Sequence, residues 1–126
     1  MTTDLTVTAD LTRSPRQLAE LYFACWEKKD FAELAPHLAE DVTFDGPLAD
    51  IVGRDECLEG LAGLARATTT LDVKRRLADE ANVMTWFELS IGCAPVTPVV
   101  NWCEVESGRI ARIRVVFDPR EILAAG

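Results

Sequence analysis

The chain has 126 residues, which is the usual size of one domain, and we do not expect a second domain. Thirteen Lys and Arg residues against 21 Asp and Glu residues give a net charge of −8, so we expect no binding to nucleic acid or to anionic membranes. Hydrophobic residues make up 48% of the sequence and charged residues 27%. This balance excludes a disordered chain and allows a core with room for a pocket.

The two ends of the chain predict tails around a single domain. Residues 1–13 lack the apolar stretch of a secretory signal, and no run of about 18 apolar residues occurs anywhere. We expect a flexible tail over residues 1–13, one domain over residues 14–126 that ends in a short tail after Asp118-Pro119, and a cytoplasmic location.

The residue types that bind metals are few and scattered. Cys25, Cys57, Cys93 and Cys103 form no C-x-x-C pair, and His37 is the single histidine. A Gly-rich phosphate loop is also missing from the sequence. We therefore predict buried free thiols, no metal site and no cofactor.

The folded part begins with a helix signal at Ser14. Ser14 as the cap, Pro15 at the first helical position and Gln17 three residues after the cap form a capping-box pattern. Apolar residues then repeat at helical spacing: Leu18, Leu21, Tyr22, Cys25 and Trp26. This spacing predicts a helix with one face against a core.

A second capping pattern follows at once. Asp30 and Glu33 repeat the spacing of a capping box, which predicts a second short helix containing Leu34 and Leu38.

A strand and a third helix are expected next. Val42–Asp45 alternates apolar and polar residues up to Gly46-Pro47, which predicts a short strand ended by a turn. A third helix is predicted from Arg54, because apolar residues again recur at helical spacing: Leu58, Leu61, Leu64 and Ala65.

From Leu71 onward the hydrophobic period changes to two, which predicts antiparallel sheet. Lys74, Arg75 and Arg76 are consecutive in this region. At most two of them can share a face of the strand, and we expect a solvated face to hold them.

The register of the last hairpin follows from parity, because residues opposite each other across two antiparallel strands share a face. A three-residue loop, Ser107 to Arg109, pairs Asn101 with Val115, Cys103 with Ile113 and Val105 with Ala111. On the other face it pairs Trp102 with Arg114 and Glu104 with Arg112. We therefore predict a cation–π pair and a charge pair on that face.

Helices followed by a strongly twisted antiparallel sheet predict an α+β domain. Several segments in this order also resemble a known group of proteins: Leu21-Tyr22, Lys29-Asp30-Phe31, residues 38–47, residues 52–55, residues 107–110 and residues 116–118. They resemble the nuclear transport factor 2-like superfamily, in particular its ketosteroid isomerase-like and SnoaL-like polyketide cyclase members. The resemblance covers most of the chain. It implies three N-terminal helices packed in a curved sheet that forms a cone-shaped half-barrel with an internal pocket.

The resemblance also implies site residues. In ketosteroid isomerases a helix tyrosine and a protonated acid donate hydrogen bonds to a dienolate oxygen, while an aspartate moves the proton. Similarity places Tyr22 at the tyrosine position, Asn101 at the acid position and Gly46 at the position of the proton-moving aspartate. Asp45 is the only carboxylate beside Gly46, and only a bulge would turn it toward the face of Phe44. Tyr22, Asn101 and Asp45 are therefore the candidate catalytic residues.

Each candidate also has a structural interpretation. Tyr22 can be a core residue with a satisfied hydroxyl, and Asp45 can be a solvated strand residue. Asn101 lies on an apolar face, where a polar group needs a protein partner or a ligand.

Three functions fit this pattern. The first is an enzyme that enolises a small apolar carbonyl compound of polyketide, steroid or terpenoid kind, with Tyr22 and Asn101 holding the oxyanion. The second is a pocket that binds such a compound without turnover. Its expected lining is Trp26, Phe44, Leu61, Phe87, Leu89 and Phe117. The third is a homodimer through the outer sheet face, with Val100, Trp102, Glu104, Arg112 and Arg114 at the interface.

Overall fold

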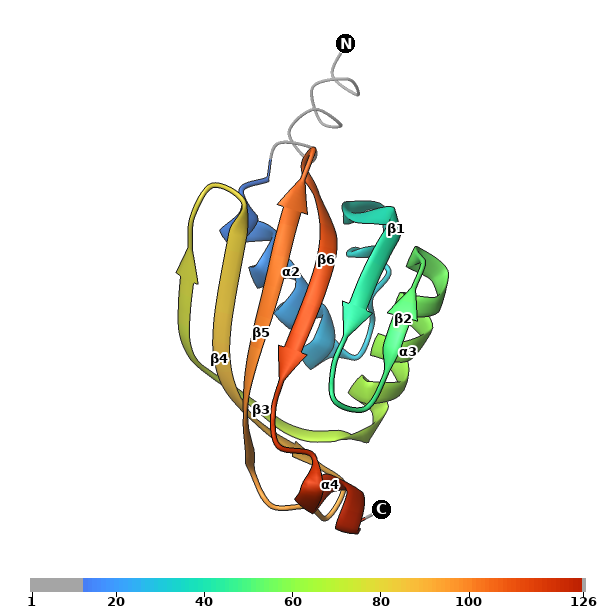
Figure 1. Cartoon of the computed structure of the whole chain (residues 1–126), viewed down its shortest axis with the longest axis vertical. Helices are drawn as coiled ribbons and strands as arrows, with labels where there is room; N and C mark the ends of the chain where they lie inside the picture. The colour runs from blue at the N-terminus through green and yellow to red at the C-terminus, as the bar shows by residue number, and fades with distance from the viewer. Residues whose placement is uncertain (1–12, 126) are drawn as a thin grey trace.

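The computed structural model describes residues 13–125 (Figure 1), so the expected tail over residues 1–13 lies, except for Arg13, outside the described residues. The elements are α2 (Pro15–Lys28), the 3₁₀ helix η1 (Ala35–His37), β1 (Leu38–Asp45), β2 (Asp50–Val52), α3 (Arg54–Ala67), β3 (Thr68–Ala78), β4 (Asn82–Ile91), β5 (Thr97–Glu106), β6 (Arg109–Val116) and α4 (Arg120–Ala125). Within residues 13–125, no helix has the length and apolar character needed to cross a membrane.

The six strands form one curved, open sheet in the order β2-β1-β6-β5-β4-β3. Helix α2 crosses behind the strands in Figure 1, and α3 packs on β1 and β2. The core lies between these helices and the inner face of the sheet. The α+β class is confirmed, but the expectation of an antiparallel sheet needs correction, because β1 runs parallel to β6.

Helix α2 starts with the expected capping box. The Ser14 hydroxyl accepts from the backbone N–H of Gln17 at 3.1 Å, and the Gln17 side chain accepts from the Ser14 N–H at 2.8 Å. The helix ends at Lys28, and the C-cap residue Lys29 has a left-handed φ of 61°. Its inner face buries the aromatic and apolar residues Leu18, Ala19, Tyr22, Phe23, Cys25 and Trp26.

The predicted second helix is wrong. The Asp30 side chain caps only the N–H of Ala32, and the chain forms a single 3₁₀ turn at Ala35–His37. Pro36 explains the short turn, because proline has no N–H to donate and restricts the residue before it. Leu38 belongs instead to β1, where it pairs with Ile110 of β6. A further difference is helix α4, which forms where we expected only a tail.

The hairpin of β5 and β6 confirms most of the predicted register. Asn101 pairs with Val115, Trp102 with Arg114, Cys103 with Ile113 and Glu104 with Arg112.

The predicted three-residue loop of this hairpin is wrong. Glu106 pairs with Arg109, and the two turn residues Ser107 and Gly108 both have positive φ, 52° and 77°. Such a turn fits the twist of the flanking strands. A register shift after Glu104 absorbs the extra residue, so Val105 pairs with Ile110 and not with Ala111.

A second register shift changes the face on which Arg76 lies. The pairing of β3 with β4 shifts between Val73 and Arg75. Arg76 therefore pairs with the buried Thr85, while Leu77 is turned outward and is 67% exposed. The expectation that Arg76 lies on a solvated face is wrong, because the bulge exchanges the two faces of the strand.

Candidate functional site

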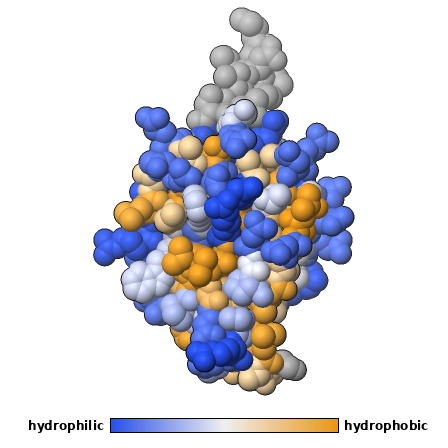
Figure 2. Space-filling view, in the orientation of Figure 1, coloured by the Kyte–Doolittle hydropathy of each residue, from blue (hydrophilic) through white to orange (hydrophobic). Residues whose placement is uncertain are grey.

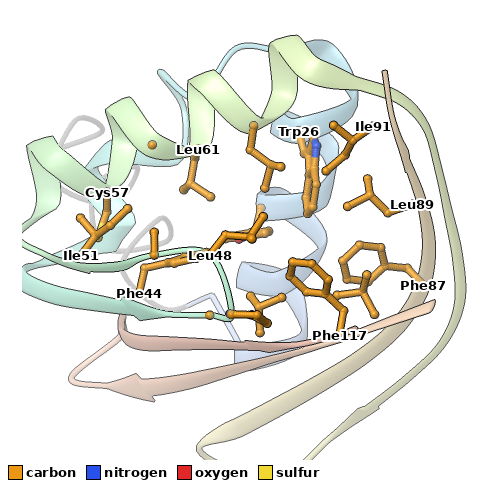
Figure 3. Close-up of a pocket in the computed structure, with 18 residues that line it drawn as sticks. Trp26, Phe44, Leu48, Ile51, Cys57, Leu61, Phe87, Leu89, Ile91 and Phe117 are labelled. Carbon is orange, nitrogen blue, oxygen red and sulfur yellow. The ribbon is translucent and has the colours of Figure 1, made fainter. Parts of the chain in front are cut away.

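A cavity of about 190 Å³ lies between helices α2 and α3 and the inner face of the sheet. The labelled side chains in Figure 3 surround it, with Leu48 of the β1–β2 turn between them. Its wall contains Tyr22, Trp26, Phe44, Gly46, Pro47, Leu48, Ala49, Ile51, Cys57, Gly60, Leu61, Leu64, Phe87, Leu89, Ile91, Val99, Val115 and Phe117. All six residues expected to line a pocket lie on this wall.

The sequence pattern explains why these residues meet. The helical stripe of α2 supplies Tyr22 and Trp26, and the stripe of α3 supplies Leu61. Alternation on β4 directs Phe87 and Leu89 to the same inner face. Apart from Gly46, the β1–β2 turn was not expected on the wall, because the sequence pattern identified it only as a strand end.

Two of the three polar side chains on the wall are bonded elsewhere. The Trp26 Nε1–H donates to the Thr68 hydroxyl at 3.0 Å, and the Cys57 thiol donates to the Val42 carbonyl at 3.7 Å. Burial raises the pKa of the Cys57 thiol from 9.0 to about 11, so it stays protonated at neutral pH. The third polar side chain is Tyr22.

Tyr22 and Asn101 meet directly, but they do not line the cavity side by side. The Asn101 amide, which is 1% exposed, donates from Nδ2 to the Tyr22 hydroxyl oxygen at 3.4 Å. Asn101 is not part of the wall and lies behind Tyr22. Burial raises the pKa of Tyr22 well above its ordinary value, so the phenol stays neutral and keeps its proton. Within residues 13–125, this proton has no acceptor.

Asp45 lies outside the cavity wall. It pairs with Asp50 of β2 and with Arg114 of β6, and neither ladder shifts its register there. Phe44 is on the wall, so the alternation of the strand directs Asp45 to the other face. The bulge that would turn Asp45 inward is not present, and the structure does not bring Asp45 together with Tyr22.

Gly46 does belong to the wall. A Cβ added at Gly46 would lie 3.4 Å from the Phe44 ring and 3.7 Å from Val115, which are van der Waals distances. The wall therefore has space for a short side chain at the position where the resemblance places the proton-moving aspartate.

The thiols are free, as expected, but they are not all buried. Cys25, Cys57 and Cys103 are buried, whereas Cys93 is exposed. In the described part of the chain, no group of three or more His, Cys, Asp or Glu side chains could hold a metal ion.

The family of this chain is shown by a family sequence profile. The sequence profile of the SnoaL-like domain matches residues 19–113, which is more than half of the chain. The chain belongs to the SnoaL-like domain family. This family is part of the nuclear transport factor 2-like superfamily, as the sequence resemblance implied. Among functionally curated proteins, no sequence matches this SnoaL-like chain.

Solved structures share the fold of the SnoaL-like chain. An NTF2-like protein from Cytophaga hutchinsonii is 18% identical with a TM-score of 0.78, over 89% of this chain and 97% of that one. A steroid delta-isomerase from Pseudomonas aeruginosa is 19% identical with a TM-score of 0.75, over 85% and 82%. An LEH-like epoxide hydrolase from M. tuberculosis is 23% identical with a TM-score of 0.69, over 85% and 84%.

One charged residue close to the site was not predicted from the sequence pattern. The Arg76 guanidinium lies 5.0 Å from the centre of the Phe23 ring, and its Nε–H donates to the Thr85 hydroxyl at 3.0 Å. Burial lowers the pKa of Arg76. The run Lys74-Arg75-Arg76 contained a signal, because three consecutive cations interrupt the alternation and one of them has to share the inner face.

Proposed function

We propose that this SnoaL-like protein binds a small apolar compound that carries one carbonyl oxygen. The observation that carries the proposal is the composition of the cavity wall. None of its 18 residues is Asp, Glu, His, Lys or Arg. The Tyr22 hydroxyl is its one polar group without an acceptor among the described residues. An apolar wall with a single hydrogen-bond donor fits an apolar ligand with a single acceptor oxygen.

The volume of the cavity narrows the ligand class. An apolar protein cavity of roughly 150 Å³ is large enough to bind benzene. A cavity of about 190 Å³ therefore favours one or two rings over the four rings of a steroid. Acetophenone and 1-tetralone are suitable probes of this size.

We favour binding over enolisation. Removal of a proton beside a carbonyl needs a base within hydrogen-bond reach of that carbon. The wall offers no carboxylate or imidazole, since Asp45 lies on the other face of β1. Tyr22 can hold a carbonyl oxygen but is too poor a base in its neutral, buried form.

The test is a thermal-shift titration of wild-type protein, Tyr22→Phe and Ala49→Trp with acetophenone and 1-tetralone. A ligand at 100 times its Kd stabilises by ~2.7 kcal/mol, which raises the Tm of a domain of this size by several degrees. Tyr22→Phe should bind the ketones roughly tenfold more weakly, because one hydrogen bond is lost. Ala49→Trp should abolish the shift, because Ala49 is exposed at the wall and an indole there fills the cavity.

Asp50→Trp provides the matched control, since Asp50 is the next residue, is exposed and is not part of the wall. It should respond to both ketones as the wild-type protein does. The absence of a shift in the wild-type protein with ketones of either size would refute the proposal.

We also propose a homodimer through the outer face of the sheet, which is a separate function of a separate surface. Trp86, Val100 and Val116 stand opposite one another on β4, β5 and β6 and are 51%, 39% and 68% exposed. In the next row Arg114 lies 4.6 Å from the centre of the Trp102 ring. Figure 2 shows an apolar group near the centre of this face, with charged side chains above it. An apolar row with charged neighbours is typical of an interface between protein chains.

The charged neighbours suit a second copy of the chain, because both signs are present. Glu104 lies 3.9 Å from the Arg112 guanidinium and 3.5 Å from that of Arg114. We expect a dimer by light scattering at about 100 µM and a monomer for Trp86→Lys, since a lysine would be buried without a partner. Leu123→Lys on α4, where Leu123 is 62% exposed, should leave the dimer intact. A monomeric wild-type protein would contradict this proposal.

A further inference from the structure

Behind Tyr22 a chain of polar groups continues away from the cavity. The Asn101 Nδ2 donates to the Tyr22 hydroxyl oxygen at 3.4 Å. On its other side, the Asn101 Oδ1 accepts from the Cys103 Sγ at 3.2 Å. Asn101 and Cys103 are each 1% exposed and Tyr22 is fully buried. Asn101 and Cys103 lie off the cavity wall and have no access to water, so each one depends on the orientation of its neighbour.

The amide of Asn101 decides whether Tyr22 can donate. In the observed orientation the amide donates to the phenol, whose own proton is left for a ligand. With the amide turned by half a rotation, the phenol would donate to Oδ1 and could only accept from a ligand. A ketone is therefore fully paired in the first orientation, whereas an alcohol, whose oxygen can also accept from Tyr22, leaves its own proton without an acceptor there. In the second orientation the alcohol can donate to Tyr22 and the ketone finds no donor.

The thiol of Cys103 fixes the first orientation only if the thiol acts as a donor. Burial raises the pKa of Cys103 to about 12, so the sulfur carries its proton. A protonated thiol can donate to Oδ1 or accept from Nδ2. A further group near Cys103 is needed to determine whether the thiol donates to Asn101 or accepts from it.

Arg76 lies in the same cross-strand row as Asn101, since it pairs with Thr85 of β4 and Thr85 pairs with Asn101 of β5. Its Nη2 is buried and has no acceptor in the described part of the structure. The charge of Arg76 acts on Cys103, since it opposes the effect of burial on the thiol pKa. A cation near a thiol favours the lone pairs of the sulfur facing the cation and the proton facing away. The hydrogen bond at 3.2 Å has the Cys103 thiol donating to the Asn101 Oδ1.

We propose that Arg76 and Cys103 determine ligand specificity: they hold the Asn101 amide in the orientation that makes Tyr22 a hydrogen-bond donor, so that the cavity selects a ketone over the corresponding alcohol. Arg76 and Cys103 do not touch the ligand and act through Asn101 and Tyr22. The inference rests on the proposed function, because it needs a ligand in the cavity.

The test compares three probes of nearly equal shape by isothermal titration: acetophenone, 1-phenylethanol and α-methylstyrene. Wild-type protein should bind the ketone roughly tenfold more tightly than the alcohol, because the hydroxyl proton of the bound alcohol would be buried without an acceptor. Cys103→Ser should keep this preference, because a hydroxyl also donates to Oδ1. Arg76→Lys should keep it because the charge remains. Cys103→Ala and Arg76→Met should both bring the ratio of the two Kd values close to one.

The hydrocarbon α-methylstyrene separates specificity from pocket shape, since it forms no hydrogen bond. Its Kd should change by less than roughly twofold among the folded variants. Cys103→Val, which fills the space of the sulfur but has no thiol, replaces Cys103→Ala if the alanine variant does not fold. Infrared spectra of bound acetophenone supply a direct readout, because donation from Tyr22 lowers the carbonyl stretching frequency in the wild-type protein and not in Cys103→Ala.

Two outcomes would overturn the inference in different ways. If Cys103→Ala and Arg76→Met keep the wild-type ketone preference while binding α-methylstyrene normally, the role of Arg76 and Cys103 in specificity is wrong and the binding pocket stands. If none of the three probes binds to the wild-type protein, the proposed function is wrong, and the inferred role of Arg76 and Cys103 is wrong with it.

Discussion

We expect Gly46→Asp to exchange the methyl protons of acetophenone with D₂O at least roughly 10²-fold faster than the wild-type protein, which is the lower range for a positioned general base. Gly46 lies on the cavity wall, and a Cβ there meets Phe44 and Val115 at distances of 3.4 and 3.7 Å that need no rearrangement. An aspartate at this position would lie on the same cavity wall as Tyr22. The exchange is measured by following the methyl signal of acetophenone in NMR spectra.

The control variants separate the base from the added side chain. Gly46→Asn has the same shape as Gly46→Asp but no carboxylate, so it should show the wild-type rate. Adding Tyr22→Phe to Gly46→Asp should lower the rate again, because the developing oxyanion loses its donor. If Gly46→Asp binds acetophenone but does not accelerate exchange, the geometry that we assign to Gly46 and Tyr22 is wrong.

Phe87→Ala should lower the free energy of unfolding by about 3–5 kcal/mol, the usual cost of removing a buried phenyl ring. Phe87 is 0% exposed, and its ring centre lies 5.1 Å from that of Phe23 and 5.4 Å from that of Trp26, both in edge-to-face geometry. The Tm should fall by roughly 10–20 °C. Thermal and urea unfolding followed by circular dichroism measure both quantities.

The same variant also tests the cavity, because Phe87 is part of its wall. Removing the ring enlarges an apolar space, so saturating benzene or α-methylstyrene should recover part of the lost stability. Glu88→Ala is the control on the next residue, where the Lys74–Glu88 ion pair at 3.8 Å is well exposed and the loss should stay below about 1 kcal/mol. A loss for Phe87→Ala as small as that for Glu88→Ala would contradict the assignment of Phe87 to the core.

The local sequence determined the elements whose residues interact with near neighbours. The capping box at Ser14 and the stripe from Leu18 to Trp26 predicted α2, because caps and helical periodicity involve residues only three or four positions apart. Parity predicted the pairing of Asn101 with Val115 and Cys103 with Ile113 for a similar reason, since the pleat repeats every two residues along both strands. The six expected lining residues also lie on the cavity wall, because each one belongs to the apolar face of its own element.

Only the tertiary structure decided the features that depend on contacts distant in sequence. Leu38 joined β1 and not a helix because it pairs with Ile110, and this pairing also made the sheet mixed. The bulge in β3 turned Arg76 inward, where the Phe23 ring and the Thr85 hydroxyl hold it. Asn101 lies behind Tyr22 because helix α2, which carries Tyr22, packs on strand β5, which carries Asn101. Periodicity assigns a residue to a face, but a single inserted residue reverses that assignment, and only the packing of the whole chain decides where the insertion falls.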